Sequence, residues 1–367
     1  MKICFLAPAN NYHTEKWCKW FVGHGHEVEV VSFINGWIDN VKVHYIDAGV
    51  SSNSGDLKKL RYLLKARDIK KLVDGIEPDI VNVHYATSYG TAAALSGLNK
   101  YVLSVWGKDI YEFPQKSLFH KAILKYSLHR AGYIFSTSHV MAKEVHKYTN
   151  KKIEITPFGV DMQLFNPNKR KRTYQDTGFV VGTVKALTEK YGIDYLIRAV
   201  SLIKKEHPEI PVCLRIAGKG EKEDEYKQLA VNEGVDKVTT WLGFISQEEA
   251  AKEWANMDVA VIASISESES FGVSAVEAQA CGTPVIVSDI PGLMETTIPG
   301  LSSLIVRRCN ERAIADALLK LFYDNKKREQ MGREGRDYVL KKFALDECFE
   351  EINKVYNTII SGAENQY

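Results

Sequence analysis

Short, unbroken apolar runs alternating with helix-like stretches constrain the fold of this chain most. Such runs are typical of strands buried on both faces of a parallel sheet. One series ends near residue 136, and a second begins near residue 179. The strands predicted for the first series are Lys2–Leu6, Glu27–Ser32, Ile80–His84, Tyr101–Val105 and Ile134–Ser136, with helices through Trp17–Val22 and near Thr91–Ser96. Those predicted for the second are Phe179–Val184, Val212–Ala217, Thr240–Leu242, Val259–Ala263 and Val285–Ser288, with a helix from Asp194.

The 367 residues are enough for two domains, each with its own core. Between the two series, residues 156–167 are dense in turn-forming residues. We therefore predict an α/β fold of two doubly wound, Rossmann-like domains, residues 1–165 and 173–345. The last stretch, 346–367, is helical without a strand to accompany, so it can pack on its own domain or return to the first.

The net charge of +2 conceals an asymmetry. Residues 1–168 carry 21 Lys and Arg against 15 Asp and Glu, whereas the remainder carries 27 against 31. The basic part is the candidate for an anionic partner or a membrane surface. Nucleic-acid binding is not supported, because the basic residues are not interleaved with an aromatic stacking platform.

No apolar run approaches 18 residues, and the start of the chain is too short for the apolar core of a signal peptide. The six cysteines show no C-x-x-C spacing, which argues against a disulfide framework or a structural zinc site. A reducing, cytoplasmic location is the expectation.

Glu269 and Glu277 flank a Ser-Phe-Gly turn between a predicted strand, 258–263, and a predicted helix, 271–281. Ligands of such units lie beyond the carboxyl ends of the strands, where a new helix exposes amide groups. The amides of Phe271, Gly272 and Val273 can donate hydrogen bonds to an anionic group of a ligand. The two carboxylates can accept hydrogen bonds from its hydroxyl groups. This combination describes a nucleotide sugar.

Five segments in the same order carry a family resemblance. They are Glu269-x7-Glu277 with Phe271-Gly272 inside it, Pro157–Asp161, Val181–Ile193, Gly25–Val28 and Val105–Asp109. The chain resembles, over nearly its whole length, the retaining glycosyltransferases of the glycogen-synthase-like family (glycosyltransferase family 4). The resemblance implies the GT-B fold, in which two Rossmann-like domains face each other across a cleft.

In the second domain, the resemblance implies a donor site for a nucleotide-diphosphate sugar. Glu277 accepts the ribose hydroxyls, Glu269 lies by the transferred sugar, and the catalytic pair Lys185 and Lys190 stabilises the leaving diphosphate. Thr183 stands where the family usually has Arg. The donor-binding residues are Thr183, Ser270, Phe271, Gly272, Val273 and Glu277. The alternative for these lysines and acids is an ordinary solvated role.

The chain has no Asp-x-Asp pair, so a metal-held diphosphate has no obvious ligands. We expect no metal and no cofactor beyond the substrate, with UDP as the nucleotide most common in the family. No side chain is obviously placed as a nucleophile. The family resemblance implies front-face attack by the acceptor hydroxyl, with the leaving diphosphate taking its proton.

In the first domain, polar and aromatic residues follow the predicted strands. His84 and Asp109 are predicted to make polar, catalytic contacts, and His13 and Trp106 to bind the acceptor. Trp106 stands where many relatives carry an active-site His, and Asn10-Asn11 replaces a common Gly pair. For each His, a satisfied loop histidine is the alternative.

Residues 56–73 carry seven basic and two acidic residues, with leucines at 57, 60 and 64. Lys116, Lys121, Lys125 and Arg130 form a second basic group. Both groups suit peripheral contact with the cytoplasmic face of a membrane, or else are the solvated faces of ordinary helices.

The predicted function is that of a retaining, metal-independent hexosyltransferase. It moves a sugar to a hydroxyl of a glycan or lipid-linked acceptor, in polysaccharide or glycolipid synthesis. The alternatives are a non-catalytic partner that binds the nucleotide sugar and a nucleotide-sugar epimerase.

Overall fold

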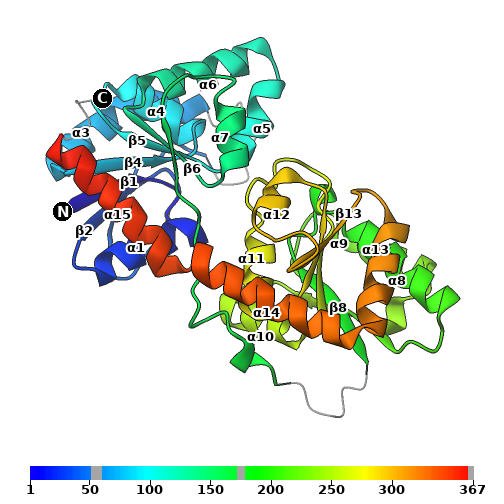
Figure 1. Cartoon of the computed structure of the whole chain (residues 1–367). Helices are drawn as coiled ribbons and strands as arrows, with labels where there is room; N and C mark the ends of the chain where they lie inside the picture. The colour runs from blue at the N-terminus through cyan, green and yellow to red at the C-terminus, as the bar shows by residue number, and fades with distance from the viewer. Residues whose placement is uncertain (51–59, 172–177, 363–367) are drawn as a thin grey trace. The chain divides into compact units, whose positions relative to one another are not determined.

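The computed structural model describes residues 1–50, 60–171 and 178–362, which form two compact units (Figure 1). Unit 1 comprises Met1–Pro157 together with the chain from Phe349 on, and unit 2 comprises Phe158–Cys348. The C-terminal segment, whose packing the sequence left open, therefore belongs mainly to unit 1. Each unit is described by itself below.

In its described part, unit 1 holds a seven-stranded sheet in the order β3-β2-β1-β4-β5-β6-β7, and every strand pair is parallel. The strands are β1 (Lys2–Leu6), β2 (Glu27–Ser32), β3 (Lys42–Tyr45), β4 (Ile80–His84), β5 (Val102–Val105), β6 (Tyr133–Ser136) and β7 (Ile153–Ile155). The helices are α1 (Tyr12–Gly23), α3 (Ala66–Ile76), α4 (Ser88–Ser96), α5 (Lys108–Tyr111), α6 (Leu118–Arg130), α7 (His139–Val145) and α15 (Leu345–Ser361), with a 3-10 helix, η1 (Leu60–Lys65).

Apolar side chains cover both faces of this sheet, which explains the unbroken runs in its central strands. On one face, Leu6 and Leu103 share a core with α3, α4 and α6. On the other, Phe5 contacts Trp17 and Phe21 of α1. Tyr356 of α15 stacks on Phe135 of β6, so the last helix completes the second face.

In its described part, unit 2 holds a six-stranded parallel sheet in the order β10-β9-β8-β11-β12-β13. The strands are β8 (Phe179–Val184), β9 (Val212–Ala217), β10 (Thr239–Gly243), β11 (Val259–Ile262), β12 (Val285–Ser288) and β13 (Ser303–Val306). The helices are α8 (Ile193–Glu206), α9 (Glu223–Asn232), α10 (Gln247–Asn256), α11 (Val273–Ala280), α12 (Pro291–Glu295), α13 (Glu311–Tyr323) and α14 (Asn325–Lys342). The main core packs α8, α9 and α13 against the sheet.

The predicted strands agree with the observed ones, but β3, β7 and β13 were not predicted. All three are edge strands. An edge strand is less completely covered and need not be a continuous apolar run. The predicted basic helix 56–73 lies partly outside the described residues, and from Leu60 it is a 3-10 helix that leads into α3.

No helix among the described residues combines the length and the apolar composition that a membrane span requires. The six cysteines are all free thiols.

Candidate functional site

In unit 2, a buried ion pair joins the carboxyl ends of the neighbouring strands β8 and β11. Lys185, directly after β8, places its Nζ 2.9 Å from Oε1 of Glu269, and both side chains are about nine-tenths buried. Burial alone would lower the pKa of Lys185, but the attraction of Glu269, Tyr191 and Glu277 outweighs it and raises the pKa. Lys185 is therefore a fixed cation at this edge.

The ring of Tyr191 contacts both of the lysines that were predicted to bind the diphosphate. The Nζ atoms of Lys185 and Lys190 lie 4.5 and 4.7 Å from the centroid of its ring, within the range of a cation–π contact. Lys190 also donates a hydrogen bond of 3.4 Å to Oγ of Ser268. The sequence reasoning missed Tyr191. The only available signal was an aromatic residue beside Lys190 in the Lys-Tyr-Gly turn.

The loop after β11 enters α11 through Gly272, whose φ of +73° suits glycine. A Cβ atom there would come within 2.5 Å of Cδ2 of Leu293, so the close packing also requires glycine. The buried ring of Phe271 packs between Phe158 and Phe343. The first turn of α11 thus starts at a fixed point, at the edge that bears Lys185.

Glu277 lies on α11 and is only 7% exposed. Nε1 of the fully buried Trp254, on α10, donates to its Oε2 at 3.3 Å. Trp254 was also missed, because nothing in the sequence pairs it with Glu277. Ser270 and Thr183 are also buried, and the Thr183 hydroxyl has no hydrogen-bond partner among the described residues.

The predicted residues of unit 1 follow β1, β4 and β5, which are neighbours in the sheet. His84, at the end of β4, is fully buried, and its ring packs against Trp17 and Trp106 with centroid separations of 5.2 and 4.3 Å. Neither ring nitrogen of His84 has a hydrogen-bond partner among the described residues. Burial lowers its pKa to about 3, so the imidazole is neutral at physiological pH.

Asp109 connects two loops at this edge. Its Oδ2 accepts a hydrogen bond of 2.8 Å from the amide of Ala86. Its Oδ1 accepts hydrogen bonds from the amides of Gly107, at 2.8 Å, and Trp106, at 3.2 Å. Burial raises the pKa of Asp109, although these three bonds oppose the rise. The carboxylate therefore fixes the loops after β4 and β5.

An aromatic row borders these loops. The ring of Trp106 lies 5.7 Å from that of His13 and 4.8 Å from that of Tyr85. Tyr12, which is more than a third exposed, lies 5.5 Å from His13. Tyr85 has a φ of +71°, which is rare for a residue with a large side chain, and burial raises the pKa of its hydroxyl. Sequence reasoning missed Tyr85, because a backbone angle leaves no sequence signal outside glycine and asparagine.

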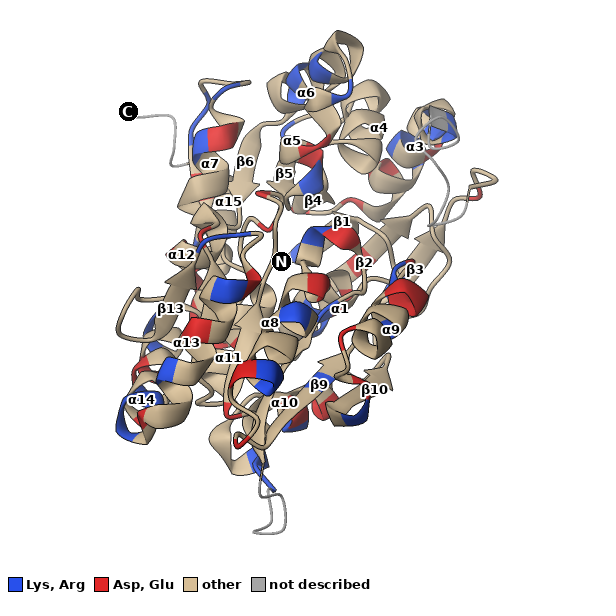
Figure 2. Cartoon of the chain, turned by 90° about the vertical axis from the view of Figure 1, so that its right-hand side faces the viewer, with Lys and Arg blue, Asp and Glu red and all other residues tan. Residues whose placement is uncertain are grey.

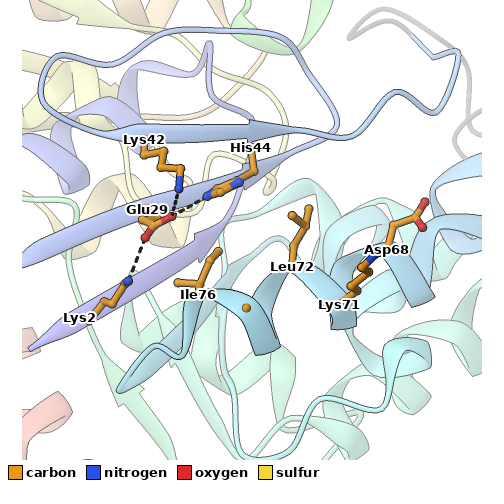
Figure 3. Close-up of a pocket in the computed structure, with 9 residues that line it drawn as sticks. Lys2, Glu29, Lys42, His44, Asp68, Lys71, Leu72 and Ile76 are labelled. Atoms are coloured by element: carbon orange, nitrogen blue, oxygen red, sulfur yellow. Dashed lines mark hydrogen bonds and ion pairs between the residues drawn. The ribbon is translucent and has the colours of Figure 1, made fainter.

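A cavity of about 500 Å³ in unit 1 lies near the other end of the strands, by the start of β1 and of β3 (Figure 3). Its centre is Glu29, which contacts His44 at 2.5 Å, Lys2 at 3.0 Å and Lys42 at 3.8 Å. Lys2, Lys42 and His44 on its wall are thus already paired with Glu29. We assign this network to the stability of the sheet.

Two family models match the chain. "Glycosyl transferase 4-like" matches residues 2–138, and "Glycosyl transferases group 1" matches residues 165–338. Together they account for most of both units. The chain belongs to the GT4-type GT-B glycosyltransferases.

Similar proteins agree with this family. D-inositol 3-phosphate glycosyltransferase of Pseudarthrobacter chlorophenolicus is 34% identical over 212 residues, which are 55% of this chain and 50% of the relative. The chain thus aligns with only about half of that relative. Sucrose-phosphate synthase of Thermosynechococcus elongatus has a TM-score of 0.85 at 18% identity, with 99% of this chain and 100% of that one covered. Anabaena HepE in complex with UDP-glucose has a TM-score of 0.80 at 18% identity, with 98% and 100% covered. These likenesses confirm the GT-B fold.

Proposed function

We propose that the chain transfers a hexosyl group from a nucleotide-diphosphate sugar to an acceptor hydroxyl, with retention of the anomeric configuration and without a metal ion. The observation that carries this proposal is the buried Lys185–Glu269 pair, with Lys190 and Tyr191 beside it. It supplies fixed cations for a diphosphate and a carboxylate for sugar hydroxyls at one strand edge.

The donor is proposed to lie along this edge of unit 2. One carboxylate oxygen of Glu277 accepts hydrogen bonds from the ribose hydroxyls, while Trp254 donates a hydrogen bond to the other, Oε2. The amides of Phe271, Gly272 and Val273 meet the diphosphate at the start of α11. Because the similarly folded HepE is described in complex with UDP-glucose, UDP-glucose is the first donor to test.

Retention is proposed to follow from attack on the face of the leaving group. The acceptor oxygen bonds to the anomeric carbon as the bond from that carbon to the diphosphate oxygen breaks. The hydroxyl proton passes to the departing phosphate oxygen. Two side chains of unit 1 could otherwise act as the base, but both are already engaged. His84 is packed against aromatic rings, and Asp109 accepts hydrogen bonds from three backbone amides. This supports the departing phosphate as the proton acceptor.

The acceptor is proposed to bind unit 1 at the aromatic row of Tyr12, His13, Tyr85 and Trp106. Aromatic faces suit the apolar C–H faces of sugars, so a glycan or a lipid-linked sugar fits this row. We propose that the chain acts in the cytoplasm in polysaccharide or glycolipid synthesis, which uses acceptors of this kind.

The test combines binding with product analysis. A thermal-shift series of nucleotide diphosphates and their sugars identifies the donor, since a ligand that binds the folded state raises its melting temperature. NMR of the product formed from that donor with a panel of glycosides reports the anomeric configuration. We expect retention and undiminished turnover in EDTA. An inverted product, or activity that returns only with a divalent cation, contradicts the proposal.

A non-catalytic partner is the second candidate, and Trp106 at the position of an active-site His in many relatives favours it. Donor binding without transfer or hydrolysis for any acceptor in the panel would decide for this candidate. Conversion of the donor into its epimer without an acceptor would instead identify an epimerase.

A further inference from the structure

A long stretch of unit 1 contains no acidic residue. Residues 113–143 include no Asp or Glu. They carry five basic residues and three histidines: Lys116, Lys121, Lys125, Arg130, Lys143, His120, His129 and His139. Helix α6 lies inside this stretch, and Figure 2 shows it with basic positions and no acidic one. The segment itself therefore carries only positive charge.

Two large apolar side chains are exposed where α6 begins. Leu118 is 85% exposed, and its neighbour Phe119 is 66% exposed. Single exposed apolar residues are ordinary, but an adjacent pair of this size at a helix start, surrounded by lysines, is not. Ser117 caps the helix through the amide of His120, so the pair lies on a formed turn.

The opposite face of α6 holds the helix in the fold. Leu124 and Leu128 are fully buried in the core of unit 1, and Ser127 is hydrogen-bonded to Thr91 of α4. The exposed pair is therefore not needed to dock α6, and its substitution leaves these core contacts in place.

We propose that the start of α6 binds the surface of an anionic lipid bilayer. Leu118 and Phe119 enter the boundary between headgroups and acyl chains, and Lys116, Lys121 and Lys125 meet lipid phosphates. Charge alone would also suit an acidic protein. The pairing of exposed apolar side chains with adjacent cations favours the bilayer, whose interface offers both environments within a few ångströms.

Flotation of the full chain with vesicles tests this proposal without reference to enzymatic activity. We expect binding to vesicles of phosphatidylcholine mixed with phosphatidylglycerol, and little binding to phosphatidylcholine alone. Binding should weaken as salt is raised. Equal binding to both kinds of vesicle, or to neither, overturns the proposal.

Variants separate the apolar and charged contributions. The double variant Leu118→Ser, Phe119→Ser should bind anionic vesicles at least about tenfold more weakly than the wild type. Its matched control is Val231→Ser, Leu340→Ser, which removes two exposed apolar side chains from unit 2. Lys121→Glu, Lys125→Glu should also lose binding, whereas Lys237→Glu, Lys326→Glu should keep most of it.

Thermal unfolding and light scattering complete the test. The Leu118→Ser, Phe119→Ser variant should have the same melting temperature as the wild type, since both side chains are exposed. Wild-type affinity of this variant for anionic vesicles overturns the proposal. A wild-type dimer that this variant dissociates, without vesicle binding by either form, would show that a second copy covers the face and would also overturn it.

Discussion

Tyr191 places one aromatic ring against two ammonium groups, and this contact makes a residue-scale prediction. A partly desolvated cation–π contact contributes about 1–2 kcal/mol. Tyr191→Phe keeps the ring, so donor affinity should stay near that of the wild type. Tyr191→Leu should weaken donor binding by about tenfold, because Lys185 and Lys190 lose their common support. Titration calorimetry with the donor measures both. Equal affinity for the Phe and Leu variants would contradict a positioning role for the ring.

The Lys185–Glu269 pair separates stability from catalysis. Lys185→Met leaves Glu269 buried without its cation, which should cost about 3 kcal/mol of unfolding free energy. The double variant Lys185→Met, Glu269→Gln removes both charges and should recover most of that loss. Neither variant should transfer sugar, because the cation by the leaving group is absent in both. Urea unfolding and a transfer assay on the three proteins check this. Restored transfer in the double variant would show that Lys185 acts only through stability.

At the scale of elements, the edge of the sheet of unit 1 depends on Glu29. Burial alone would raise the pKa of Glu29, but hydrogen bonds from His44 and Lys2 outweigh burial and lower it below its ordinary value of 4.5. A carboxyl group with a lowered pKa in the folded state stabilises the protein at neutral pH. This contribution is lost as the pH falls through the folded-state pKa. The network therefore holds β1, β2 and β3 together least well in acid.

Glu29→Gln should lower the unfolding free energy at about pH 7 by about 1–2 kcal/mol. The difference from wild type should shrink as the pH falls through the lowered folded-state pKa of Glu29, where the wild-type side chain is itself protonated. Urea unfolding across this range, followed by circular dichroism, measures it. Glu27→Gln is the matched control, because Glu27 is mostly exposed and also pairs with Lys2. A constant difference across the range would assign the effect to packing instead of charge.

Most of the strands found from the sequence are central strands that are covered on both faces, and the edge strand β10 is an exception. Strands β1, β2, β8, β9 and β12 have the predicted bounds. In β1, β8 and β12 a nearly continuous apolar run leaves few other structures. The edge strand β3, Lys42–Tyr45, alternates polar and apolar residues and carries no such signal. At the site, the spacing of Glu269 and Glu277 followed from the strand-loop-helix unit. The contacts of Trp254 with Glu277 and of Tyr191 with two lysines depend on side-chain packing, which periodicity does not encode.

At the scale of the whole molecule, the packing of the final helix determines which unit is destabilised by substitutions near the end of the chain. Residues 345–348 of α15 belong to unit 2, but from Phe349 on the chain belongs to unit 1. The fully buried ring of Phe349 contacts those of Trp17, Trp20 and Phe21 at 5.1, 5.5 and 6.1 Å. Although it lies 192 residues beyond the last other residue of unit 1, Pro157, Phe349 is part of its core.

Phe349→Ala should therefore destabilise unit 1 by about 3–5 kcal/mol, the cost of truncating a buried aromatic ring. Unit 2 has its own sheet and core, so its ordered amides should keep their protection, and donor affinity should persist at temperatures where unit 1 has opened. Hydrogen exchange resolved by peptide, with and without the donor, distinguishes the two units. The matched control Ile360→Ala changes an exposed position of the same helix and should leave both units protected. Simultaneous loss of protection in β1 and β8 of Phe349→Ala would mean that the units unfold as one, and that the last helix stabilises the whole chain instead of unit 1 alone.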